Sequence, residues 1–135
     1  MIKRTLRIGH WVVDFLFCED RYDIDGVVAC LYDAFAPQRI IDKAVNLMRS
    51  CEYDCGFTYS NPVHRRAVVL IGPTTSASEF LNSFSHEVRH LADAIALSIG
   101  VDLHSETPAY LTGDAVMALA EVVCRFGCEH CRKKG

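Results

Sequence analysis

The sequence predicts an α+β protein, and three observations support this class. A segment rich in β-branched and aromatic residues lies at 6–17, and two further strand-like runs lie within 56–72. Two long stretches with apolar residues every three or four positions follow, at 76–99 and 105–127. The resulting order of a strand, two helices, a strand pair and two long helices is typical of α+β proteins. The chain has 135 residues, of which 50% are hydrophobic, so we expect one globular domain spanning 1–135.

The first fifty residues predict a strand and two helices. The strand lies within Leu6 to Phe17, and Asp25-Gly26 then turns the chain. A short helix is expected over 27–36. Pro37 fits the first position of a second helix, which runs to about Met48 with apolar residues at helical spacing.

The strand pair predicted within 56–72 consists of two unequal segments. Phe57-Thr58-Tyr59 comes first, Ser60-Asn61-Pro62 is a turn signal, and the apolar run from Ala67 to Ile71 follows. We expect this pair to form a short antiparallel or mixed sheet with the N-terminal strand.

The two long helices carry clear end signals. Ser76 and Glu79 have the spacing of a capping box, and Gly100 is a natural C-terminal stop for the helix over 76–99. The helix over 105–127 begins near Ser105, with a proline in its first turn. Each helix has one apolar face, which should pack on the sheet.

Composition excludes several functional classes. The formal net charge of −3 argues against a nucleic-acid binder or a protein attracted to anionic membranes, since both need a basic surplus. The longest apolar runs are far below the roughly 20 residues of a membrane span. The apolar stretch near the N-terminus contains Asp14 and lacks the features of a signal peptide. We therefore expect a cytoplasmic protein whose seven cysteines are reduced.

The chemistry-bearing motif is His86-Glu87-Val88-Arg89-His90, an HExxH pattern. Residues i and i+4 lie above one another on a helix, so both imidazoles can reach one metal ion while the glutamate stays close to a water molecule. At about 100° per residue, His86 and His90 lie almost opposite the apolar face of their helix. The pattern therefore predicts a metal site on the polar side of that helix.

A catalytic zinc site needs a third protein ligand, and the next helix offers one. Glu106, Tyr110, Asp114 and Glu121 form a polar stripe opposite that helix's apolar face. We infer that this stripe faces the histidines, with Glu106 as the third ligand and His104 or Asp102 as alternatives. Position 96 is alanine, which excludes the metzincin spacing.

This ligand set suits Zn²⁺ and hydrolysis. The ion would polarise a water molecule, and Glu87 would take its proton as the water attacks a carbonyl carbon. Tyr110 would donate a hydrogen bond to the resulting oxyanion. Asp93 or Asp114 would orient an imidazole by accepting its second N–H.

From Gly56 to about Cys131 the chain resembles the small gluzincin-like HExxH proteins found in phages and mobile elements of Bacteroides-type bacteria. The resemblance rests on four segments: Gly56-Phe57-Thr58-Tyr59-Ser60-Asn61, Val68-Val69-Leu70-Ile71-Gly72, His86 to Leu91, and Glu106-Thr107-Pro108-Ala109-Tyr110-Leu111-Thr112-Gly113-Asp114.

The resemblance implies a minimal zincin domain. It would have a small sheet whose edge strand lies beside the active-site helix, His86 and His90 as zinc ligands, Glu87 as base and Glu106 as third ligand. It implies peptidase-like chemistry on a peptide or protein substrate. The run from Ala67 to Ile71 would then bind an extended peptide at the sheet edge, or it is simply a buried strand.

Other interpretations remain open at this point. The chain is alternatively a zinc-stabilised binding or regulatory module without catalysis, or an accessory protein of a mobile element that acts on one host or phage protein. Cys128 and Cys131 are free thiols, or they hold a second, structural zinc with a further Cys or His, such as Cys51 or Cys55. Cys124 would pack against its neighbours.

Overall fold

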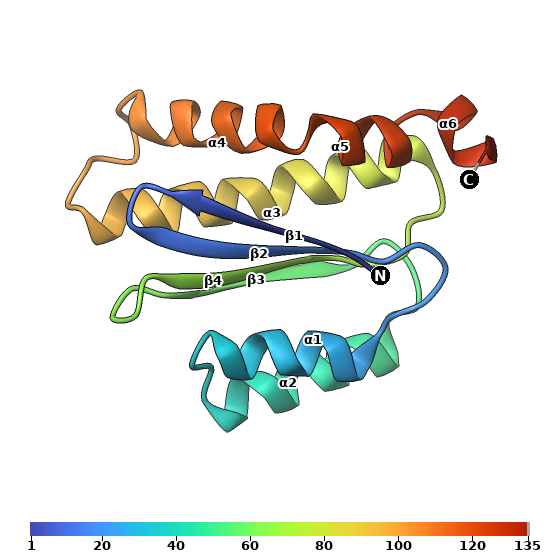
Figure 1. Ribbon diagram of the computed structural model, residues 1–135, viewed down its shortest axis with the longest axis horizontal. Coiled ribbons are helices and arrows are strands. Elements are labelled where there is room, and N and C mark those ends of the chain that lie inside the picture. The colour runs from blue at the N-terminus through green and yellow to red at the C-terminus, as the bar shows by residue number, and fades with distance from the viewer. Residues whose placement is uncertain (135) are drawn as a thin grey trace.

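The computed structural model describes residues 1–134, which form three layers (Figure 1). A four-stranded sheet lies between two helices on one face and the C-terminal helices on the other. The elements are β1 (Ile2–Ile8), β2 (Trp11–Phe17), α1 (Ile24–Asp33), α2 (Gln38–Ser50), β3 (Gly56–Asn61), β4 (Arg66–Ile71), α3 (Ala77–Ser98), α4 (Thr107–Ala118), α5 (Ala120–Phe126) and α6 (Glu129–Lys134). The predicted α+β class, with a mixed sheet packed on two long helical segments, is confirmed.

The strand order is β1-β2-β4-β3, so β1 and β3 are the two edges. β1 and β2 are antiparallel, as are β3 and β4, whereas β2 and β4 are parallel. The crossover between β2 and β4 contains α1, α2 and β3, which is long enough to return the chain in the parallel direction.

The two central strands are buried on both faces. In β2, Val13, Phe15 and Phe17 face α3, α4 and α5, and Leu16 faces α1 and α2. β4 alternates in the same way. Val69 faces α3, α4 and α5, and Val68 and Leu70 face α1 and α2. Burial on both faces explains the uninterrupted apolar run in β4.

The suggestion that Ala67 to Ile71 binds a peptide at the sheet edge is therefore wrong, and the buried-strand alternative is confirmed. β4 pairs with β2 on one side and with β3 on the other, so its backbone groups are already occupied. The strand with a free side next to α3 is β3.

The N-terminal segment contains a hairpin where the sequence analysis expected one strand. Gly9 takes a φ of 59°, a left-handed conformation that glycine adopts without steric cost, and Gly9-His10 form the turn. The two predicted helices, 27–36 and 37–48, correspond to α1 and α2. Asp23 caps α1 by accepting a hydrogen bond from the backbone N–H of Gly26.

The predicted helix over 76–99 is α3, and Ser76 caps it by accepting a hydrogen bond from the N–H of Glu79. The helix expected over 105–127 is two helices, because the chain breaks at Leu119 between α4 and α5. The sequence offers no glycine or proline at that break. α6 was not predicted, since its six residues are almost entirely polar. None of the helices within residues 1–134 is both long and apolar enough to cross a bilayer.

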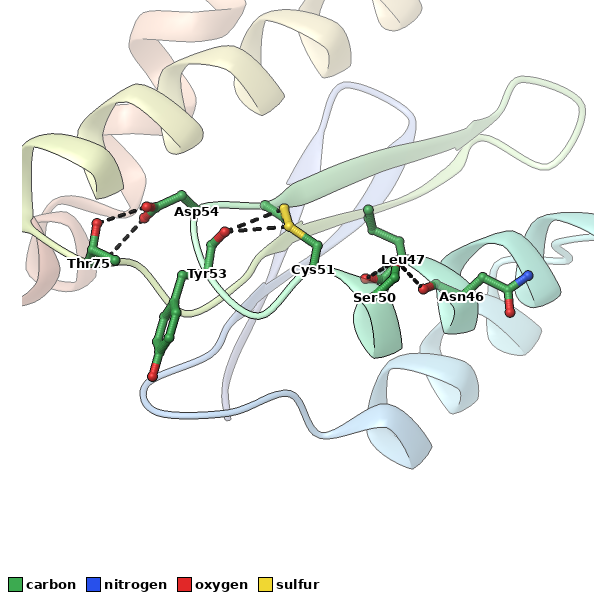
Figure 2. Close-up of a disulfide and its surroundings, with 8 residues drawn as sticks. Asn46, Leu47, Ser50, Cys51, Tyr53, Asp54 and Thr75 are labelled. Carbon is green, nitrogen blue, oxygen red and sulfur yellow. Dashed lines mark hydrogen bonds between the residues drawn. A yellow bond between two sulfur atoms is a disulfide. The ribbon is translucent and has the colours of Figure 1, made fainter.

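Two of the seven cysteines are joined in a disulfide, which corrects the expectation that all of them are reduced. Cys51 ends α2 and Cys55 precedes β3, and their Cα atoms lie 6.4 Å apart, within disulfide range. Figure 2 shows the bridge beside the carbonyl oxygen of Tyr53, which lies 3.5 Å from both sulfurs. Cys51 and Cys55 are thus not free to bind a structural zinc ion.

Replacing Phe17 with alanine tests the larger core. Its ring lies about 6 Å from those of Phe80, Phe84 and Phe126, so it joins β2 to α3 and α5. We expect Phe17→Ala to lower the free energy of unfolding by about 3–5 kcal/mol, the usual cost of a buried cavity of this size. Unfolding in urea measures this change in free energy. Val63→Ala is the neutral control, because Val63 is 85% exposed. A loss below about 1 kcal/mol would contradict the packing described.

Candidate metal centre

The polar side of α3 faces the β3 edge of the sheet. The helix packs its apolar side chains, among them Phe84, Val88 and Leu91, into the core. On the neighbouring side, the hydroxyl of Thr58 in β3 donates a hydrogen bond to the backbone carbonyl of Glu87, at 3.0 Å. This strand-to-helix contact fixes the rotation of α3, and with it the direction of the HExxH side chains.

The two histidines converge on one point. Their Nε2 atoms lie 3.1 Å apart and their rings are nearly perpendicular, at 83°. Two imidazole nitrogens bound to one tetrahedral zinc ion, each at about 2.1 Å, lie about 3.4 Å apart. The spacing therefore suits shared metal binding. With an oxygen of Glu87, the ligand atoms of the three residues all lie within 4.8 Å of one another.

Glu87 differs from the histidines in its burial. Its side chain is 5% exposed, while both imidazoles are exposed. Burial raises the pKa of the Glu87 carboxyl, and the nearby charges of His86 and His90 and a hydrogen bond from Thr58 act in the opposite direction. The carboxyl thus lies beside the histidines in a partly desolvated position.

A cavity of about 610 Å³ opens beside the three residues. Its walls come from α3 and from β3 and the loop before it, and they include Asp54, Cys55, Gly56, Thr58, Asn82 and Ser83. An added Cβ at Gly56 would lie 2.4 Å from the backbone oxygen of Leu70 and 3.4 Å from Glu87. Glycine therefore allows β3 to begin close to the backbone of β4, next to Glu87.

The loop before β3 is held in place by polar contacts. The carboxylate of Asp54 accepts hydrogen bonds from the backbone N–H and the hydroxyl of Thr75, at 2.9 and 2.8 Å (Figure 2). The disulfide closes the same loop on its other side. The wall formed by Asp54 and Cys55 is thus tied both to α2 and to the segment that leads into α3.

The structure does not bring the expected third ligand to this group. Among the residues described, the group contains His86, Glu87 and His90 alone. Glu106 precedes the first residue of α4 and is exposed, as are His104 and Asp102. None of these three residues lines the cavity beside the histidines.

The reason is the position of the C-terminal helices over the sheet. Glu121 of α5 accepts a hydrogen bond from Arg4 of β1, at 3.2 Å, whereas α3 contacts β3 at the opposite edge. The polar stripe of the C-terminal helices and the histidines of α3 are therefore directed toward opposite edges. The inferred arrangement, with both stripes facing one site, is not found.

The other predicted site residues are engaged elsewhere or lie in solvent. Tyr110 is 69% exposed, and Asp114 is exposed on α4. Asp93 accepts a hydrogen bond from Arg89 at 2.8 Å in an i,i+4 ion pair on the surface of α3. None of the three lines the cavity beside the histidines.

The residues that β3 contributes to the cavity, above all Thr58, are not among the site residues that the sequence predicts. A usable signal was present, because β3 mixes polar and apolar residues whereas the run from Ala67 to Ile71 is wholly apolar. Mixed polarity is typical of a strand with one side toward solvent, and a continuous apolar run of a central strand. Asp54 and Cys55 had no comparable signal, since their position depends on how the loop folds back.

Comparisons with protein-family models, with curated proteins and with solved structures found no match.

The geometry makes a direct prediction about zinc affinity. His90→Ala should raise the zinc dissociation constant by more than about 100-fold, because it removes one of two converging nitrogens. Glu106→Gln should bind zinc like the wild type, because Glu106 lies outside the group. Competition with a chromophoric chelator measures both constants. A large loss of affinity in Glu106→Gln would instead favour the third ligand that the resemblance implies.

Proposed function

We propose that this protein is a zinc-dependent hydrolase of the gluzincin-like type that cleaves a peptide or related amide bond. The observation that carries the proposal is the convergence of His86 and His90 beside the buried Glu87, on the wall of a cavity that follows an open sheet edge. An HExxH motif supplies two ligands and a base for this chemistry.

In this proposal each residue of the motif has a separate role. Bound Zn²⁺ supplies a Lewis acid that polarises a carbonyl group and lowers the pKa of a coordinated water molecule. His86 and His90 hold the ion through their Nε2 atoms. Glu87 accepts a proton from the attacking water and passes it to the leaving amine. Thr58 positions Glu87 by donating a hydrogen bond to its backbone carbonyl, and the same hydroxyl lies 3.5 Å from its carboxylate.

The free edge of β3 favours an extended peptide as the substrate. β3 pairs with β4 on one side, and at its other side its backbone groups can pair with an added strand. Side chains alternate along β3, so that Thr58 faces α3 while Phe57 and Tyr59 face α2. A second cavity of about 380 Å³, lined by Ile40, Ala44 and Leu47 of α2 and by these two aromatic rings, would accept an apolar substrate side chain.

Catalytic zinc sites typically have three protein ligands. Among the described residues, only Glu87 lies with the two histidines. His86 and His90 would hold the ion, and a third ligand would come from outside this group. The comparison of Glu106→Gln with the wild type decides whether Glu106 supplies that ligand.

Replacing Glu87 with glutamine separates catalysis from metal binding. Glutamine has nearly the same shape but cannot accept the proton, so we expect zinc content to stay at the wild-type level and hydrolysis to fall by about 10²–10⁴-fold. Cleavage of a diverse peptide mixture, read by mass spectrometry, measures activity, and metal analysis measures zinc. Glu79→Gln, an equivalent change near the start of α3, should alter neither.

Two outcomes would contradict this account. If Glu87→Gln loses its zinc, Glu87 is a ligand and not the base. If wild type and variant both bind zinc and are equally inert, the non-catalytic binding module is the better description.

A further inference from the structure

We propose that Cys124, Cys128 and Cys131 form a second metal site, which binds a thiophilic ion of the Zn²⁺ class through their sulfur atoms. The three cysteines follow a CxxxCxxC spacing at the junction of α5 and α6. They are among the five cysteines outside the disulfide, and the proposed hydrolytic site does not use them.

The thiol of Cys131 lies close to that of Cys124. Its Sγ atom is 4.0 Å from the Sγ atom of Cys124. Two sulfurs bound to one tetrahedral zinc ion, each at about 2.3 Å, lie about 3.8 Å apart. The pair formed by Cys124 and Cys131 is therefore already near the required spacing.

The three cysteines reach the surface of the protein. Cys124 is exposed, and Cys128 and Cys131 are partly exposed. The three ligand atoms do not all lie within 4.8 Å of one another, unlike those of the histidine group. Closing all three on one ion thus requires rotation of cysteine side chains at the surface.

The backbone that carries these cysteines is fixed to the rest of the protein. Glu129 accepts a hydrogen bond from the backbone N–H of Ala77 at the start of α3, at 2.6 Å. Arg132 donates to the backbone oxygen and the hydroxyl of Thr74, at 2.8 and 3.0 Å. At the corner between the helices, an added Cβ on Gly127 would lie 2.8 Å from Leu81 of α3. These contacts hold the start of α6 against the segment that leads into α3, so little conformational entropy is lost when the ion binds.

The chemistry of the ligand set selects the ion. Three thiolates prefer soft or borderline ions such as Zn²⁺ over Mg²⁺ or Ca²⁺, which prefer oxygen. A disulfide between any two of the cysteines would leave the third unpaired, whereas one ion takes all three. The thiols bind as thiolates and release their protons, so affinity rises with pH. No change of oxidation state is involved.

Cobalt is a suitable probe, because Co²⁺ replaces Zn²⁺ and thiolate ligands give it a near-ultraviolet charge-transfer band that imidazole and carboxylate ligands do not. The experiment uses the full chain carrying His86→Ala and His90→Ala, which removes the other candidate centre. Titration with Co²⁺ under a phosphine reductant should produce this band, and added Zn²⁺ should abolish it. Cys124→Ser, Cys128→Ser and Cys131→Ser should each weaken the band or eliminate it.

Two controls test whether the band comes from these three cysteines. The double variant Cys51→Ser/Cys55→Ser should leave the band unchanged, which excludes the thiols that the reductant releases from the disulfide. Cys30→Ala should also leave the band unchanged, which excludes a thiol elsewhere in the chain. Circular dichroism verifies that each variant is folded. Absence of the band in the protein carrying His86→Ala and His90→Ala, or its persistence when Cys131→Ser is added, would overturn the proposal. Because this protein lacks both histidines, none of these outcomes bears on the hydrolytic site.

Discussion

The burial of β2 and β4 on both faces is the constraint on which the rest of the structure depends. Two apolar strands at the centre of a sheet need helices on each side, since exposing either face would cost the hydrophobic free energy of its side chains. α1 and α2 cover one face, and α3 with α4 and α5 covers the other (Figure 1). β3 is left at the edge beside α3, so the HExxH residues lie next to a strand that is paired on one side only.

The contact between Thr58 and Glu87 connects the sheet to the candidate metal centre. The same hydroxyl ties β3 to the backbone of α3 and approaches the carboxylate that would act as base. Burial of this carboxylate disfavours its ionised form, whereas the charges of the neighbouring histidines favour the ionised form. A cation held by His86 and His90 would favour the ionised form further, so metal binding and ionisation of Glu87 should support each other.

The sequence predicts local features of this protein better than distant ones. The capping box at Ser76, the periodicity of α3 and the HExxH spacing are local, and the structure bears out the helix and the convergence of its histidines. The placement of Glu106 required knowing which sheet edge α4 and α5 cover, and no local pattern contains that information. The same limit applies to β4, whose central place in the sheet does not follow from its composition, because strand order depends on the crossover.

The central claim is that one ion binds between His86 and His90 on the β3 side of α3. A crystal structure of the zinc-loaded protein, with anomalous data collected at the zinc absorption edge, tests it most directly. The account predicts an anomalous peak about 2.1 Å from the Nε2 atoms of both histidines, facing the cavity beside β3. A peak bound by only one of these histidines, or none at this position, would contradict it.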